Sequence, residues 1–247
     1  MSRWKAAAIH LSISATIGVI VGALLFGVWY PPPYFHAAGA DELVLLLVGV
    51  DLTLGPLLTL VVFKSGKRGL KFDLAVIGIA QTAALVYGLS VVLVSRPVFL
   101  VGVLDRFVLV AANEISDDDL AQGSKPEFRS RSWTGPRLVA AELPTDDKER
   151  SELAFSALAG RDAQNLPKYY RDYSEAGKAL LAKAKPLDVL RKKRPGDVAE
   201  LDAWLAGAGR NADSVVWLPV VARKSDLVML MDAQTAAPLK ALPINPW

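Results

Sequence analysis

Two carboxylates, Asp51 and Asp73, are the residues best placed for unusual chemistry, because each lies in or beside a long apolar stretch. A pair of such carboxylates can form a protease dyad when they share a proton at about 3 Å. Asp51, however, lies about 18 Å from the inner end of its stretch, whereas Asp73 lies beside that end. Gly49-Val50-Asp51 also lacks a glycine directly before the aspartate. The spacing therefore argues against an aspartyl protease.

Each of the two carboxylates has another interpretation. A carboxylate in a membrane-spanning helix is costly unless partnered. Asp51 is either a protonated or hydrogen-bonded contact within a helix bundle or a contact with a partner's transmembrane segment. His10 differs from it in height by about 12 Å, too far for a direct pair. Asp73 is interpreted as a structural carboxylate that a helix dipole and Lys71 stabilise. The candidate bundle partners of Asp51 are Thr53, Thr59, Gln81 and Thr82.

The chain lacks the catalytic residues that most enzyme classes require. The chain has two histidines, His10 and His36, and no cysteine, so the part after residue 96 contains neither type. This excludes Ser–His–Asp, Cys–His and histidine-based zinc sites there, and no phosphate-binding glycine motif appears. A Ser–Lys dyad at Lys224-Ser225 stays open beside the simpler interpretation as a hairpin turn. The basic residues 191–194 favour a solvated helix end. We expect no enzyme, no metal and no cofactor.

Three apolar stretches, at residues 6–28, 43–63 and 74–95, position these side chains. They are 23, 21 and 22 residues long, and Asp51 is the one charged residue among them. About 20 apolar residues in a helix cross roughly 30 Å of hydrocarbon. The first stretch is too long for a signal peptide and has no cleavage site. The sequence therefore predicts a membrane protein with a three-helix anchor over residues 1–96.

The charge distribution predicts the orientation of this anchor. The net charge of +3 belongs entirely to residues 1–96, because the 21 basic and 21 acidic residues of 97–247 cancel. Lys and Arg collect on the cytoplasmic side of short membrane loops. Arg3 and Lys5 precede the first stretch, residues 64–71 hold four basic residues, and residues 30–42 hold none. We expect the N-terminus in the cytoplasm and the C-terminal domain in the periplasm of a bacterium.

Small residues and one proline are further features of the apolar stretches. Ser14, Gly18 and Gly22 are four residues apart, which places them on one helix face. Small faces allow close helix packing in lipid. This face is either a contact with the second or third stretch or, with Asp51, a docking surface for a partner's helix. Pro56 removes one backbone hydrogen bond from the second stretch, which a bundle can tolerate.

Residues 97–247 predict one soluble α+β domain. Runs at 98–103, 106–111, 137–142, 214–221, 227–231 and 238–242 read as strands. Segments 146–159, 174–185 and 197–205 read as helices, the first capped by Thr145 or Asp146. Asp105 and Arg106 are assigned structural roles between the first two strands. Strands at both ends with helices between them are typical of the α+β class.

Several motifs resemble the TfpX/TfpZ-type family of type IV pilin accessory proteins. They are Trp29-Tyr30-Pro31-Pro32-Pro33, the segment from Gly49 to Thr59, Lys71-Phe72-Asp73-Leu74-Ala75-Val76, Arg96-Pro97-Val98-Phe99-Leu100, Asp105-Arg106-Phe107 and the terminal Pro246-Trp247. The resemblance covers essentially the whole chain and is strongest over residues 29–107. It implies an inner-membrane protein that promotes assembly or surface display of a cognate type IV pilin. It brings no established active-site residues.

A pilin-binding accessory factor is the function that these observations favour. A pilin has one apolar helix and a periplasmic head, and this chain offers a membrane face and a domain at membrane height. The alternatives are a membrane-anchored periplasmic sensor or ligand-binding module, and a Ser–Lys or carboxylate membrane enzyme. The inner loop, residues 64–71, is too short for a sensor's output element. We expect the lipid bilayer and a pilin as partners and no nucleic acid.

Overall fold

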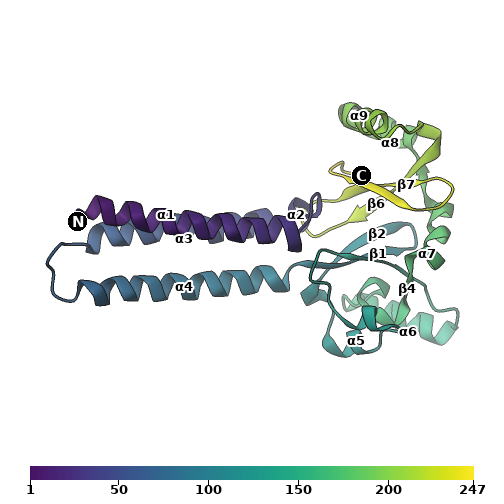
Figure 1. Ribbon diagram of the computed structural model, residues 1–247. Coiled ribbons are helices and arrows are strands. Elements are labelled where there is room, and N and C mark those ends of the chain that lie inside the picture. Colours follow the sequence, from purple (N-terminus) through teal and green to yellow (C-terminus); the bar gives the residue numbers. More distant parts are fainter.

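Three long helices project from one side of a sheet domain (Figure 1). The computed structural model describes all 247 residues. Helix α1 (Arg3–Leu24) continues as a π-helical turn (Leu25–Trp29), and α3 (Ala40–Val62) and α4 (Leu70–Val94) follow. All three are long and apolar enough to cross a membrane. The expected fold class, three such helices followed by an α+β domain, is confirmed.

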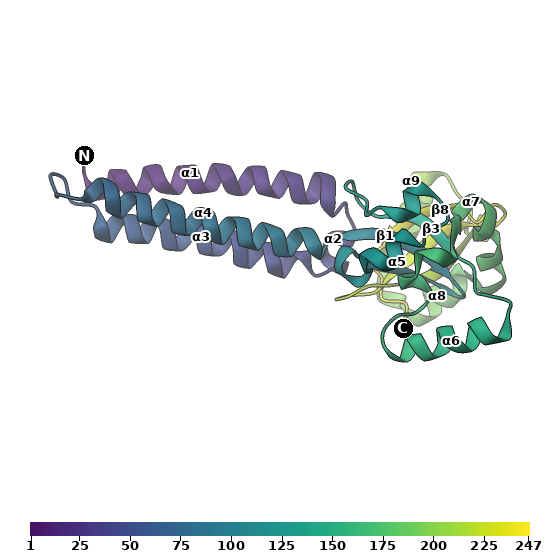
Figure 2. The ribbon, with the colours of Figure 1, turned by 90° about the horizontal axis from the view of Figure 1, so that it is seen from below.

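Helix α3 is the central element of the bundle, because it packs against both α1 and α4. Figures 1 and 2 show the three helices running side by side, with the short helix α2 (Tyr34–Ala37) near the domain. At that end, Val21, Leu25 and Val92 are buried together, and the Tyr30 hydroxyl donates to the Val92 carbonyl at 2.7 Å. Most other apolar side chains of the bundle are exposed, as expected for helices whose solvent is lipid.

One eight-stranded sheet forms the centre of the domain. Its order is β4-β3-β1-β2-β6-β7-β8, and β5 pairs with β6 beside β2. Strand β1 is parallel to β3 and β2 is parallel to β6, whereas the other pairs are antiparallel. The strands are β1 (Pro97–Val103), β2 (Arg106–Ala111), β3 (Arg137–Ala141), β4 (Tyr170–Asp172), β5 (Lys185–Pro186), β6 (Val215–Val221), β7 (Leu227–Asp232) and β8 (Pro238–Leu242).

Short helices pack against this sheet, and their apolar side chains complete its hydrophobic cores. Strand β1 is buried at all seven positions, and Phe99 packs edge-on against Tyr170. Trp217 of β6 is fully buried in a second core with leucines of α8 and α9. These large apolar side chains account for the stability of the domain. The helices are α5 (Asp117–Ala121), α6 (Asp147–Leu158), α7 (Tyr173–Ala176), α8 (Leu187–Lys193) and α9 (Val198–Ala208).

The structure corrects one predicted helix and adds elements. Residues 174–185 do not form a single α-helix, because α7 ends at Ala176 and a 3-10 segment, Gly177–Lys183, follows. A Cβ at Gly177 would lie 2.7 Å from the Tyr173 ring, so this turn is built around a glycine. The basic residues 191–194 lie at the end of α8, as predicted, whereas the start of α8 and the strands β4 and β5 were not predicted. The predicted cap is confirmed, since the Asp146 side chain accepts from the Glu149 amide at 2.9 Å.

Candidate functional site

A polar seam crosses the interior of the three-helix bundle. It consists of His10 and Ser14 on α1, Asp51 and Thr59 on α3, and Gln81 on α4. Gln81 Nε2 donates to Asp51 Oδ1 at 3.0 Å and to the Asp51 carbonyl at 3.3 Å. His10 Nδ1 lies 2.6 Å from Thr59 Oγ1. Hydrogen bonds between membrane helices contribute roughly 0.6 to 2 kcal/mol each, so the seam fixes how α1, α3 and α4 pack.

The spacing of polar residues along α3 explains how this helix makes hydrogen bonds with both α1 and α4. Asp51, Gly55 and Thr59 are four residues apart and therefore share a face. Thr59 follows Asp51 by eight residues, which is about 12 Å along the helix. This distance equals the difference in height between Asp51 and His10. His10 therefore bonds Thr59 and not the carboxylate. Among the four candidate partners of Asp51, the structure selects Gln81.

Gly55 is the notch through which Gln81 reaches α3. A Cβ at this position would lie 2.6 Å from Gln81 Cδ, closer than real Cβ contacts come. The next residue, Pro56, has no amide hydrogen, so the Leu52 carbonyl accepts no i→i−4 bond. Gly55 thus leaves room for the Gln81 side chain, and Pro56 removes one backbone hydrogen bond from α3 near Asp51. Pro56 therefore has a structural role.

The seam leaves two acceptor atoms without a donor. Gln81 Oε1 is buried and has no hydrogen-bond partner. Asp51 uses Oδ1 toward Gln81, and no side chain or backbone donor reaches its Oδ2. Unsatisfied acceptors are expensive in an apolar layer. Asp51 Oδ2 and Gln81 Oε1 are therefore the two atoms of the seam that could accept a hydrogen bond from a further partner.

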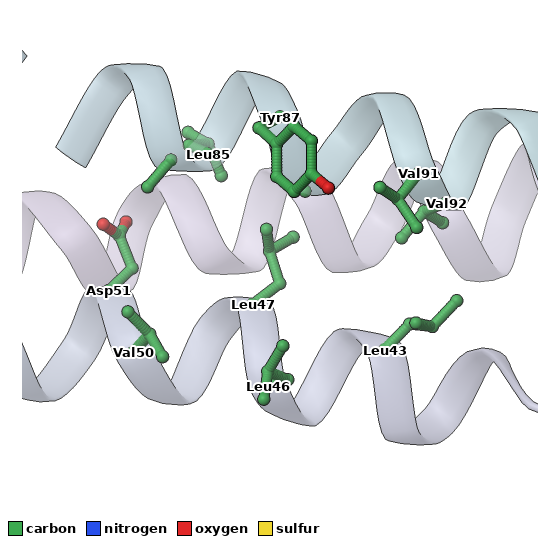
Figure 3. Close-up of a pocket in the computed structure, with 11 residues that line it drawn as sticks. Leu43, Leu46, Leu47, Val50, Asp51, Leu85, Tyr87, Val91 and Val92 are labelled. Carbon is green, nitrogen blue, oxygen red and sulfur yellow. The ribbon is translucent and has the colours of Figure 1, made fainter. Parts of the chain in front are cut away.

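An apolar groove between α3 and α4 opens beside Asp51, and we call it the α3–α4 groove (Figure 3). It encloses about 350 Å³. Figure 3 shows the Asp51 carboxyl at one end and the Tyr87 ring on the opposite wall. A Cβ at Gly88 would collide with Leu47, so the two helices approach closely along the groove floor. Its lining residues are Leu43, Leu46, Leu47, Val50, Asp51, Ala84, Leu85, Tyr87, Gly88, Val91 and Val92.

The small face of α1 lies mainly inside the bundle. Ser14 is 4% exposed, and a Cβ at Gly18 would lie 3.4 Å from Val48 of α3. Ser14 and Gly18 line one narrow cavity with Asp51, whereas Gly22 lies outside it. The structure thus uses Ser14 and Gly18 for packing within the chain. A partner helix cannot contact the Ser14 side chain unless α1 and α3 separate.

The other residues to which the sequence assigns structural roles, Asp73, Asp105 and Arg106, form ion pairs at the ends of helices or strands. Asp73, in the first turn of α4, pairs with Lys67 at 2.6 Å and not with Lys71. Asp105 and Arg106 pair at 2.8 Å where β1 turns into β2. The Arg106 guanidinium lowers the pKa of the Asp105 carboxyl. No group of three or more His, Cys, Asp and Glu side chains is placed to hold a metal ion.

An ionic latch, which the sequence did not reveal, joins the bundle to the sheet domain. Lys224 Nζ, in the turn between β6 and β7, lies 2.8 Å from Asp41 Oδ2 and 2.9 Å from Glu42 Oε1 at the start of α3. Its amide also donates to the Ala37 carbonyl at 2.9 Å. Hydrogen bonding to Asp41 raises the pKa of the Lys224 ammonium. Lys224 is thus a structural residue of the junction.

Arg96 forms a second connection between the helices and the sheet domain. Its guanidinium donates to the Leu93 carbonyl at 2.6 Å and to the Ser132 carbonyl at 3.1 Å. The Trp133 ring lies over it at 4.5 Å. The arginine therefore joins the end of α4 to the loop that precedes β3.

Comparison with known proteins identifies the family. The first 39 residues match the family model of "Fimbrial assembly protein FimB". The chain is 33% identical over 228 residues to the fimbrial assembly protein of serogroup I from Dichelobacter nodosus, which covers 90% of this chain and 87% of that protein. The chain belongs to the fimbrial assembly protein family. The serogroup E1 protein is 32% identical over the same shares of both chains.

A third relative of this chain is shorter. The fimbrial assembly protein of serogroups C1 and C2 from Dichelobacter nodosus is 36% identical over 121 residues, which is 48% of this chain and 92% of that protein. No solved structure matches the chain.

Gly55→Ala tests whether the notch controls the polar seam. The new Cβ must displace the Gln81 amide from Asp51, so we expect a loss of about 1–3 kcal/mol in the free energy of unfolding. Gly49→Ala on the same helix is the matched control. Its Cβ would meet nothing within 4 Å, so it should be neutral or stabilising by about 0.5–1 kcal/mol. Unfolding in detergent micelles, followed by circular dichroism, measures both, and equal stability of the two variants would contradict the notch.

Lys224→Glu tests the ionic latch. It places a third negative charge beside Asp41 and Glu42, so amide hydrogen exchange over residues 34–42 should accelerate by about fivefold. Arg223→Glu is the control, because it makes the same charge change next door at a residue without an ion pair. A second Asp41→Lys change should return exchange toward the parent rate. Indistinguishable exchange in the Lys224→Glu and Arg223→Glu variants would show that the latch has no structural effect.

Proposed function

We propose that this chain is an inner-membrane accessory factor that binds a cognate type IV pilin and promotes its assembly or surface display. The observation that carries the proposal is the 33% identity over 228 residues to a fimbrial assembly protein. That alignment takes in 90% of this chain, so it includes both the helices and much of the sheet domain. The proposal places the chain in the TfpX/TfpZ-type group and assigns it no catalytic step.

The two-part architecture supports a pilin as the partner. A pilin in the inner membrane has one apolar helix and a globular head outside the bilayer. The three long helices can contact such a helix, and the sheet domain follows α4 after only Ser95 and Arg96. The domain is therefore held at the height where the pilin head begins.

The proposed topology is an N-terminus in the cytoplasm, an anchor over residues 1–96 and a periplasmic domain over residues 97–247. The basic residues at the N-terminus and between α3 and α4 support it, because positive loops stay in the cytoplasm. Three crossings then leave the sheet domain on the outer side.

Reporter fusions test this topology. Alkaline phosphatase, fused after Trp247 or inserted at Gly66, is active only in the periplasm. We expect activity from the Trp247 fusion and none from the Gly66 insertion, because an odd number of crossings separates the C-terminus from the cytoplasm. A green fluorescent protein fused at the same two positions gives the opposite readout. A fluorescent Trp247 fusion that lacks phosphatase activity would disprove the topology.

Isolation of the complex tests pilin binding. In a bacterium that makes this chain and its pilin, mild detergent extraction and affinity capture of a tag on this chain should recover the pilin in about stoichiometric amount. An unrelated three-span protein with the same tag is the control. Deletion of the gene for this chain should also remove surface pili while the pilin persists in the inner membrane. Normal piliation after deletion, with no pilin in the captured material, would refute the proposal.

A further inference from the structure

The α3–α4 groove is an open apolar surface formed by two of the three helices. Leu46 and Tyr87 on its two walls are 70% and 73% exposed, although both lie well within the apolar length of their helices. Its floor is closed by the contact of Leu47 with Gly88. In a bilayer, this surface meets either acyl chains or another helix.

Two polar atoms on the groove distinguish these occupants. Asp51 Oδ2 has no donor, and the Tyr87 hydroxyl makes no hydrogen bond within the chain. Figure 3 shows both groups on the groove, on facing helices. An acyl chain offers neither donors nor acceptors, so it would leave both groups unsatisfied in hydrocarbon. A helix can bring a polar side chain to Asp51 and an acceptor to Tyr87, as buried polar groups in membranes require.

The groove also leads toward the sheet domain. Leu43 and Val91 at its domain-side end line a second, polar cavity of about 320 Å³ together with Glu42, Ser95 and Arg223. An occupant that follows the groove therefore leaves the apolar layer beside the domain. This path suits a helix that continues into a polar head, and it suits an entirely embedded molecule poorly.

We propose that the α3–α4 groove is the docking site for the transmembrane helix of the pilin. This inference rests on the proposed function and specifies its surface. Asp51 and Tyr87 are the polar contacts of the site, and Leu46 and Val50 are its apolar wall. The small face of α1 is a packing face of the bundle and takes no part in docking.

Cysteine crosslinking tests the site directly, because the chain contains no cysteine of its own. Leu46→Cys places one thiol on the groove. Val19→Cys on α1 is the control, because the Val19 side chain is 73% exposed and the Leu46 side chain is 70% exposed. Each variant is made together with a pilin that carries single cysteines along its apolar helix. Mild oxidation in native membranes should join Leu46→Cys to the pilin with a helical periodicity, and Val19→Cys should give no pilin adduct.

Two further variants test the polar contacts. Tyr87→Phe removes only an exposed hydroxyl, and we expect it to reduce co-isolated pilin by about threefold to tenfold. Asp51→Leu should reduce it by about tenfold or more, whereas Asp51→Asn, which still accepts from Gln81, should lose less. Unchanged pilin recovery from both Tyr87→Phe and Asp51→Leu would overturn the assignment.

The crosslinking outcomes distinguish failure of the proposed docking site from failure of the proposed function. Pilin adducts from Val19→Cys alone would overturn the groove and leave the proposed function standing. Disulfide dimers of Leu46→Cys without pilin would make the groove an interface between two copies of this chain and overturn it as well. No adduct from either position, combined with no pilin after affinity capture, would refute the proposed function itself.

Discussion

Polar groups in an apolar layer must find their partners within the protein, and this constraint shapes the whole bundle. The Asp51 carboxylate is the group on which it acts most strongly, because its alternative partner is hydrocarbon. Gln81 meets it from α4, and Gly55 leaves the room that this contact needs. His10 and Thr59 repeat the arrangement between α1 and α3 about two turns nearer the N-terminus of α1. The three helices thus pack in one register that their apolar side chains alone would not specify.

The partial satisfaction of this seam links structure to function. A bundle that only anchored a domain would gain from satisfying every acceptor internally. Here the Asp51 carboxyl and the Tyr87 side chain line a groove that remains open. Such groups favour association in the membrane, where an added hydrogen bond contributes roughly 0.6 to 2 kcal/mol. The small residues of α1 serve a different purpose, since they allow α1 and α3 to approach.

Local patterns in the sequence were sufficient to predict many elements. Unbroken apolar length predicted α1, α3 and α4, and short β-rich runs between turns predicted β1, β2, β6, β7 and β8. The break after Ala176 depends on the Tyr173 ring over Gly177, a contact that helix propensity does not contain. The central parallel pair β2–β6 joins strands more than 100 residues apart in the sequence. No local pattern predicts such a pairing.

The candidate site was predictable to a similar degree. Asp51 stood out because a lone carboxylate in an apolar stretch is rare, and Gln81 was among its four possible partners. The Lys224–Asp41 pair was not found, since 183 residues separate its members. Spacing also could not decide whether the Ser14 face packs inside the chain or outside it. That question depends on which side of α1 faces α3, which only the tertiary structure determines.

The connection between α4 and β1 has a mechanical consequence. Two residues, Ser95 and Arg96, span at most about 7 Å, and Arg96 is held from both sides by Leu93 and Ser132. The end of α4 and the start of β1 are therefore held in a fixed relative orientation. A tilt of α4 would therefore reorient β1, which pairs with both β2 and β3, and with it that half of the sheet.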